Sequence, residues 1–263
     1  MIELMARQSG IQKLYHYQVF NEEFLITTLR DMKLFCSSPS NVNDPWDCKP
    51  YFAVRPMLED QGKREEFVTF VGNPHGPKEF RDPNLEGYLD GIRRDDDKLK
   101  KAIEDCSQIL WKKLSDRRIY CLTPIADSTL MWSHYAANHC GICLEFDTGN
   151  ELIGSALQVR YSITYPEWVP QDANKDLLAL VLTKSDVWAY EKEFRLIASS
   201  RESPLMLHGD FVLLPKGALT AIIVGCQSSD YTNIQKIVET YCPWIPVKRA
   251  VRVANRYQIT IQD

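Results

Sequence analysis

Short runs of aromatic and β-branched residues recur along the chain and alternate irregularly with helical patterns. Because strands and helices do not alternate regularly, the order predicts an α+β fold around a central antiparallel or mixed sheet rather than a doubly wound one. We predict strands at 13–20, 34–38, 117–124, 142–147, 156–166, 188–200, 210–215, 219–226 and near 247–261, and helices at 21–33, 127–141, 175–185 and 231–242.

This pattern breaks once, between about residues 56 and 115. Proline and glycine are frequent at 72–91, and the apolar residues that follow have a helical period up to residue 114. We therefore predict one domain, residues 1–263, with a helical insertion at about 56–115 and a mobile lead-in. The charged run at 93–101 is predicted to be the solvated start of the long helix.

Length and composition define the broad class of the protein. The 263 residues are 44% hydrophobic and 25% charged, which is enough to bury a sizeable core. A net charge of -4 argues against a cationic nucleic-acid coat but leaves room for a local basic patch. No apolar run approaches the roughly 18 residues of a membrane helix, and the first ten residues lack a signal-peptide core. We expect a cytoplasmic protein with no membrane partner.

The eight cysteines are scattered, and only Cys140 and Cys143 have C-x-x-C spacing. A zinc site needs a second pair or well-spaced histidines, whereas His134 and His139 fall on the wrong side of a plausible helix end to join the two cysteines. Buried free thiols explain the cysteines more simply. We expect no metal.

The stretch "YEKEFRLI" (190–197) places Glu191, Glu193 and Arg195 at every second position. In a strand these three charges share one face. They could form an exposed face with an ordinary ion pair, or a desolvated cluster suited to acid–base chemistry. The spacing alone leaves both explanations open.

Three further segments place polar side chains where burial is predicted. His16 lies mid-strand between Tyr15 and Tyr17, where a core histidine bonded to a backbone carbonyl is the simpler explanation. The serines of "SSPS" lie at the end of a strand, a common place for turn formers. In the helix "MWSHYAANH", His134 could line a cleft above the sheet. The serines are Ser37, Ser38 and Ser40.

The motifs "LYHY", "LFCSSPSNVNDPWD", "LMWSHYAANHCGICLEFD" and "WAYEKEFRLI", in this order, resemble a widespread bacterial family of unknown function. More loosely, the order is similar to that of ADP-ribosyltransferases, which carry a histidine or arginine on a first strand, a serine motif on a second and E-x-E on a later one. His16, "SSPS" and the pair Glu191 and Glu193 match these positions. The resemblance implies a split central sheet and NAD as co-substrate.

The same resemblance implies roles for individual residues. Glu193 would be catalytic, and Glu191 would position the acceptor. His16 would hold the ribose of NAD, and one of the serines would brace the nicotinamide half. Arg195 would fix the carboxylates or contact a phosphate. The aromatic residues that could stack on nicotinamide are Tyr15, Tyr17, Trp46 and Tyr51. The prolines in "SSPSNVNDP" depart from the usual serine motif.

The C-terminal "VKRAVRVANRYQ" contains four cations and no acid. In one continuous strand Lys248, Arg252 and Arg256 share a face, which suits phosphate contacts with an RNA or DNA acceptor. The alternative is an edge strand that carries charge against aggregation. Related small bacterial transferases resemble toxins of phage-defence or toxin–antitoxin systems, which implies a nucleic-acid or protein acceptor and a neutralising antitoxin protein.

Two other classes of function remain open from the sequence. In a non-catalytic binding module, the face of Glu191, Glu193 and Arg195 would contact protein or nucleic acid. In a metal-dependent nuclease, Asp44 and Asp47 would act with the two glutamates. The aspartates lie in a turn-rich loop, where they have ordinary structural uses.

Overall fold

The computed structural model describes residues 4–73, 84–173, 176–200 and 205–263. Its contacts divide the chain into two compact units. Unit 1 comprises Met1–Ser38, Arg117–Tyr161 and Asp186–Asp263, and unit 2 comprises Pro39–Asp116 and Ser162–Ser185. The predicted insertion therefore lies within unit 2, together with shorter segments on both sides of it in the sequence.

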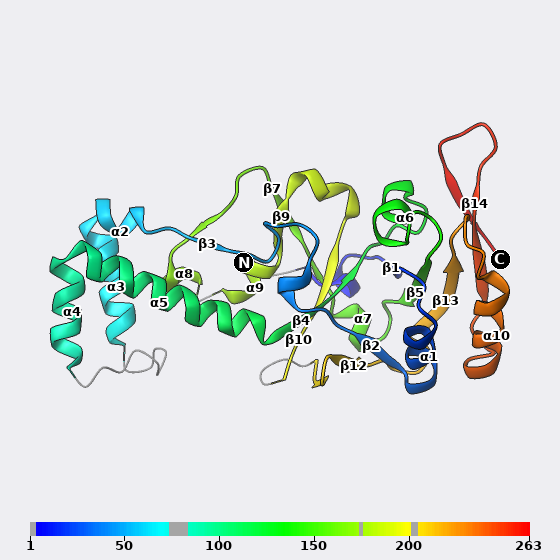
Figure 1. Ribbon diagram of the computed structural model, residues 1–263, viewed down its shortest axis with the longest axis horizontal. Coiled ribbons are helices and arrows are strands. Elements are labelled where there is room, and N and C mark those ends of the chain that lie inside the picture. The colour runs from blue at the N-terminus through cyan, green and yellow to red at the C-terminus, as the bar shows by residue number, and fades with distance from the viewer. Residues whose placement is uncertain (1–3, 74–83, 174–175, 201–204) are drawn as a thin grey trace. The chain divides into compact units, whose positions relative to one another are not determined.

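Unit 1 is built from several small sheets and the helices that cover them (Figure 1). Its elements are η1 (Ala6–Gln8), β1 (Lys13–Gln18), α1 (Glu22–Asp31), β2 (Lys33–Phe35), β4 (Arg117–Leu122), α6 (Thr129–Tyr135), β5 (Ile142–Asp147), α7 (Glu151–Gly154), β6 (Leu157–Gln158), η4 (Asp186–Glu191), β10 (Phe194–Ser199), β11 (Leu207–His208), β12 (Phe211–Leu213), β13 (Leu219–Val224), α10 (Tyr231–Tyr241), β14 (Val247–Arg252) and β15 (Ile259–Gln262). This mixture confirms the predicted α+β class.

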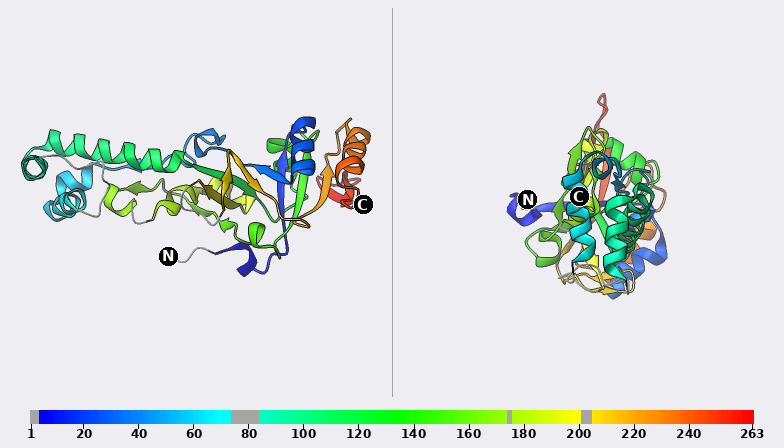
Figure 2. Two further views of the ribbon diagram at one scale, coloured as in Figure 1. Left: turned by 90° about the horizontal axis from the view of Figure 1, so that it is seen from below. Right: turned by 90° about the vertical axis from the view of Figure 1, so that its left-hand side faces the viewer.

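The largest sheet has the strand order β1-β5-β13-β14-β15. All its neighbouring pairs are antiparallel except β13 with β14, which are parallel, so the sheet is mixed as predicted. The helices α1 and α10 pack against each other beside this sheet (Figures 1 and 2). Alternating residues of its strands, such as Leu14, Leu144 and Ile222, are buried in the same core as α1 and α10. The opposite face packs against Trp132 and Met131 of α6.

A second sheet has the order β4-β10-β6. It joins the largest sheet through one isolated bridge, in which the backbone groups of Tyr15 and Thr123 exchange hydrogen bonds of 2.7 and 2.9 Å. Ser37 makes a similar bridge to Ile119, with two bonds of 2.8 Å. The strand β4 is thus paired with β10 on one edge and is touched by β1 and the segment after β2 on the other.

Unit 2 is mainly helical. Its core is formed by apolar residues of α2, α3, α4 and α5, including Phe67, Ile92 and Leu99. Its elements are η2 (Pro39–Asn41), β3 (Tyr51–Phe52), α2 (Arg55–Glu59), α3 (Gln61–Gly72), α4 (Leu85–Arg94), α5 (Asp96–Ser115), β8 (Glu167–Trp168), α8 (Pro170–Ala173), α9 (Leu177–Val181) and β9 (Thr183–Ser185), and β7 (Arg160–Ser162) lies where the chain passes between the units. The region 56–115 contains nearly all of α2 and the whole of α3, α4 and α5.

Within that region the predicted boundaries were wrong. The charged run at 93–101 does not start one helix, because Asp95 ends α4 and its side chain caps α5 by accepting bonds from the amides of Asp97 and Lys98. Part of the lead-in predicted as mobile is helical in α3 and α4, and its residues 74–83 lie outside the described residues.

Other elements also differ from the prediction, and the helix predicted at 175–185 is limited to α9, which β9 follows. The helix predicted to stop at Gly141 ends at Tyr135, because Ala137, Asn138 and His139 all adopt left-handed backbone conformations. The strand predicted at 188–200 begins only at Phe194. The terminal segment forms the β14–β15 hairpin rather than one strand. In the described part of the chain, no helix is both long and apolar enough to span a membrane.

Candidate functional site

The strand β4 brings together three segments that are far apart in the sequence. On one edge of β4, Arg195 of β10 pairs with Cys121. On the other edge, Ser37 pairs with Ile119 and Tyr15 pairs with Thr123. The first strand, the serine segment and the segment of the two glutamates therefore all contact the six-residue strand β4 or Thr123 directly after it, within unit 1.

His16 is fixed by that strand. Its Nδ1 lies 2.7 Å from the carbonyl oxygen of Cys121, and its ring stacks on Tyr120 with a centroid distance of 4.1 Å. Because a carbonyl only accepts, Nδ1 carries the proton and Nε2 is the acceptor in the neutral ring. Burial lowers the pKa of His16 to about 4, against the opposing effect of the bond to Cys121. From the sequence, a histidine bonded to a backbone carbonyl was the simpler explanation for His16, and His16 has such a partner in Cys121.

Glu191 is buried at the end of η4. Its carboxylate accepts a hydrogen bond of 2.5 Å from the hydroxyl of Tyr135 in α6. Its backbone carbonyl accepts a bond of 2.6 Å from Oγ1 of Thr123, which follows β4. Glu191 is thereby held between α6 and the end of β4.

Glu193 lies just before β10 and pairs with Arg195 inside that strand. Nε and an Nη of Arg195 donate to the two carboxylate oxygens at 2.7 and 2.9 Å. Glu193 is 3% exposed and Arg195 is fully buried. This is a bidentate buried ion pair, so the explanation as an exposed charged face is wrong.

The two glutamates do not alternate along one strand as predicted. Lys192, between them, has a left-handed backbone with φ of 47°, and the residues before it form a 3₁₀ helix. The reason is packing, since Trp188 and Tyr190 of η4 lie against His134 of α6. Strand geometry begins only after Glu193, and the shared face is lost.

His134 is exposed and lies beside two half-buried rings. Its Nδ1 shares a hydrogen bond of 3.0 Å with the hydroxyl of Tyr190, and its ring makes an edge contact with Trp188. Trp188 and Tyr190 also contact each other at 6.1 Å. We call His134, Trp188 and Tyr190 the aromatic cluster. It adjoins Glu191 in sequence and through Tyr135, which follows His134 in α6.

The remaining predicted cofactor residues separate into two groups. Ser37 and Ser38 are half-buried in unit 1, where Ser37 bridges to β4. Ser40 is exposed within η2 of unit 2. Tyr17 is buried, and its hydroxyl donates to the carbonyl of Ile125 at 2.8 Å. The position of Tyr17 is that of a core residue.

The acids and cysteines considered for metal binding have other contacts. Asp44 accepts a bond from the amide of Trp46, and Asp47 forms a buried ion pair of 3.7 Å with Lys184 in unit 2. Cys140 is exposed while Cys143 is buried in β5, and none of the eight cysteines forms a disulfide. Within the described ranges, no group of three or more His, Cys, Asp or Glu residues is placed to hold a metal ion.

The C-terminal cations do not form one stripe. Lys248 pairs with Glu145 at 3.8 Å and with Asp263 at 3.2 Å, and Arg252 is the last residue of β14. Arg256 lies in the hairpin loop, so strand alternation does not relate it to the other two. Because β14 is flanked by β13 and β15, it is not the edge strand of the alternative explanation either.

Sequence reasoning missed three residues that hold the glutamates. Tyr135 donates to Glu191, Thr123 donates to its backbone, and the hydroxyl of Tyr161 accepts from the amide of Glu193 at 2.8 Å. Of these three residues, only Tyr135 could have been suspected from the sequence, because it lies next to the candidate His134 in a short helix rich in aromatic residues. The contacts of Thr123 and Tyr161 join segments that are between 30 and 70 residues apart in the sequence. A local sequence pattern cannot predict contacts over such separations.

One family comparison bears on this region. The model of a family described as "Protein of unknown function (DUF2971)" matches residues 131–196, a segment that contains His134, both glutamates and Arg195. No curated protein and no solved structure matches the chain. Over the segment that carries most of α6, β5 and the two glutamates, the chain is similar to a family whose description assigns no function.

Proposed function

We propose that unit 1 is an NAD-dependent ADP-ribosyltransferase that modifies a macromolecular acceptor. The observation that carries this proposal is the convergence on β4 of the segments of His16, Ser37 and the two glutamates. These are the three segments that the resemblance assigns to one site. They come from widely separated parts of the sequence, and the local patterns of the sequence do not require them to meet.

The chemistry divides between the two carboxylates. As the bond between ribose C1′ and nicotinamide breaks, its electron pair leaves with nicotinamide, and C1′ becomes cationic. Glu193, oriented through both oxygens by Arg195, would hydrogen-bond a ribose hydroxyl and stabilise that charge. Glu191 would receive the proton that the acceptor loses when it attacks C1′. Its bond from Tyr135 keeps one carboxylate oxygen in place for this step.

His16 suits a ribose contact in its neutral form. With Nδ1–H donated to Cys121, the acceptor Nε2 can receive a hydrogen bond from a ribose hydroxyl. The half-buried ring is held by Tyr120, which limits its rotation. Ser37, on the same edge of β4, would brace the nicotinamide half.

The acceptor in this proposal is a macromolecule, either a nucleic acid or a protein. RNA, DNA and protein are equally compatible with this proposal as acceptors of ADP-ribose. The toxin or phage-defence role, with a neutralising antitoxin, rests only on the resemblance to ADP-ribosyltransferases. An enzyme of this kind would consume NAD in the cell unless it were restrained. Growth arrest on expression, reversed by Glu191→Gln, would agree with such a role.

A second candidate is a non-catalytic binding module. It is favoured by the burial of both carboxylates and by the partly exposed aromatic cluster beside them. In that case the cluster of His134, Trp188 and Tyr190 would form the contact surface, and the glutamates would only support it. Binding would then show no dependence on NAD.

Nicotinamide release distinguishes the two candidates. The purified protein is incubated with NAD, alone and with cellular RNA or protein, and nicotinamide is measured by chromatography. The transferase predicts release that falls by about 100-fold or more in Glu191→Gln, which keeps an oxygen for Tyr135. Glu239→Gln, an exposed glutamate of α10, is the matched control and should keep full release.

A folded wild-type protein that releases no nicotinamide under any of these conditions contradicts the transferase. So does release that is equal in wild type and Glu191→Gln. Either result leaves the binding module as the better account.

A further inference from the structure

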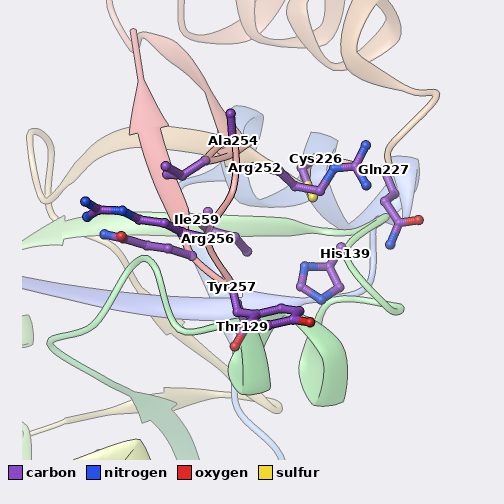
Figure 3. A pocket seen from close by; sticks show the side chains of 11 residues that line it. Thr129, His139, Cys226, Gln227, Arg252, Ala254, Arg256, Tyr257 and Ile259 are labelled. Atoms are coloured by element: carbon purple, nitrogen blue, oxygen red, sulfur yellow. The ribbon is translucent and has the colours of Figure 1, made fainter.

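A separate cavity of about 600 Å³ lies on unit 1 beside the β14–β15 hairpin (Figure 3). Its walls come from the hairpin loop, the start of α6, His139 and the Cys226–Gln227 loop. This volume is within the range of pockets that hold a small organic ligand. Of the described residues that line it, none is acidic.

One wall is pre-formed by an unusual turn. Ala137, Asn138 and His139 have φ of 47°, 52° and 69°, a strained conformation for residues with a β-carbon. The turn is held by Gln227, whose amide donates to the carbonyl of His139 at 3.0 Å and whose side chain donates to Asn138. Gly225 permits this contact, since a β-carbon there would overlap the carbonyl of His139. The wall is therefore rigid before any ligand arrives.

His139 lines the cavity, and one of its ring nitrogens has no hydrogen-bond partner among the described residues. Its Nδ1 is buried and forms no hydrogen bond with any described residue. Burial also lowers the pKa of His139, which favours the neutral ring. Buried polar atoms are normally satisfied, so this nitrogen indicates a small missing partner such as a bound water, and it contributes to the polar character of the wall.

The positive charge at the cavity is also uncompensated. Arg252 and Arg256 are exposed, and neither forms an ion pair with any residue in the described ranges. The nearby Lys248, in contrast, is paired with Glu145 and Asp263. Figure 3 shows Arg252 reaching towards Cys226 and Gln227, whereas Arg256 extends in another direction. Arg252 is thus the cation best placed for an anion held against the rigid wall.

Groups suited to a planar, polar ring complete the lining. Tyr257 is fully exposed at the cavity, where its ring can stack on a ligand. The side-chain amides of Gln227 and Gln258 offer donors and acceptors for the edge of such a ring. We infer that this cavity binds a phosphorylated nucleoside, with Arg252 at the phosphate and Tyr257 against the base.

A phosphorylated nucleoside could reach this cavity in two forms. It could be a free nucleotide, or it could be the phosphorylated end of a single-stranded RNA or DNA. The inference does not depend on ADP-ribosyl transfer, because the cavity residues are not those proposed to act on NAD. Binding is therefore measured without NAD, and nicotinamide release is measured separately. A negative result for nucleotide binding would not count against the proposed transferase, and absence of nicotinamide release would not count against nucleotide binding at this cavity.

The test is calorimetric titration of the full chain. The ligands are AMP, GMP, CMP and UMP, inorganic phosphate, and single-stranded oligonucleotides with and without a 5′-phosphate. Each is titrated into wild type, Arg252→Gln, Tyr257→Leu and Arg249→Gln. Arg249 is the matched control, since it is a neighbouring arginine of β14 that stacks on Tyr231 instead of lining the cavity.

We expect at least one nucleotide or 5′-phosphorylated oligonucleotide to bind, with affinity reduced about tenfold or more in Arg252→Gln and in Tyr257→Leu. Arg249→Gln should bind like wild type. Binding of mononucleotides identifies a free nucleotide as the source, and binding of 5′-phosphorylated oligonucleotides alone identifies a strand end. The inference is overturned if nothing binds, if phosphate binds as tightly as the nucleotides, or if Arg252→Gln and Arg249→Gln behave alike.

Discussion

At the scale of single residues, burial decides what each candidate side chain can do. His16 was identified from its position within a predicted strand, and Glu191, Glu193 and Arg195 from their spacing; all four have defined partners in unit 1. Spacing could not give those partners, because Cys121, Thr123 and Tyr135 are supplied by other elements. It also could not show that the chain turns at Lys192, where the left-handed conformation depends on packing of η4 against α6.

The buried pair of Glu193 and Arg195 makes a prediction about stability. Glu193→Gln alone removes the carboxylate charge that binds the buried guanidinium through two hydrogen bonds, so we expect a loss of about 3–5 kcal/mol in the free energy of unfolding. Replacing both, with Glu193→Gln and Arg195→Met, removes the buried guanidinium as well and should recover much of that loss. Urea denaturation of the four proteins gives the coupling energy. Additive effects of the two changes would show that the pair does not interact as described.

His16 predicts how stability depends on pH. Its pKa is about 4 when folded, below the ordinary value of 6.5, so the unfolded chain binds its proton first as pH falls. The contribution of His16 is therefore fully present above pH 6.5 and is lost progressively towards pH 4, by about 3 kcal/mol.

The matched variant is His16→Asn, which can keep a donor near the carbonyl of Cys121 but does not titrate. Thermal or urea unfolding between pH 7 and pH 4 should show a shallower loss of stability in the variant than in wild type. Equal slopes over this range would mean that His16 is not buried in its neutral form.

At the scale of elements, the sequence predicted those with strong local patterns. Asn21 caps α1 at the start of the helix predicted for 21–33, and β1, β4, β5, β13 and α10 lie close to their predicted ranges. The failures are short elements whose ends depend on distant contacts. Neither the end of α6 at Tyr135 nor the hairpin at 253–258 is marked by a proline or a glycine in the sequence.

The turn after α6 can be tested through Gly225. In Gly225→Ala the added methyl group overlaps the carbonyl of His139, and both groups belong to rigid backbone. We expect a loss of about 1–3 kcal/mol in the free energy of unfolding. Gly91→Ala in α4 is the control, because its methyl group meets only the flexible side chain of Lys98 and alanine favours a helix. Equal stability of Gly225→Ala and wild type would contradict the tight approach of these loops.

At the scale of the whole molecule, the chain separates into an α+β unit and a mainly helical unit. The irregular order of strands and helices predicted the mixed class, and the change in pattern after residue 56 located most of the helical unit. The sequence could not show that 39–55 and 162–185 belong with those helices, since their assignment depends on contacts across more than 100 residues. Every residue proposed for the transfer reaction lies in unit 1.

The most direct test of the account follows the ADP-ribose itself. NAD labelled in its adenylate phosphate is incubated with the protein and cell extract, and acid-insoluble RNA, DNA and protein are counted separately. The account predicts label in one fraction, dependent on Glu191 and Glu193 and unaffected in Glu239→Gln. A folded protein that leaves all label acid-soluble, with NAD intact, would contradict the assignment of unit 1 as a transferase.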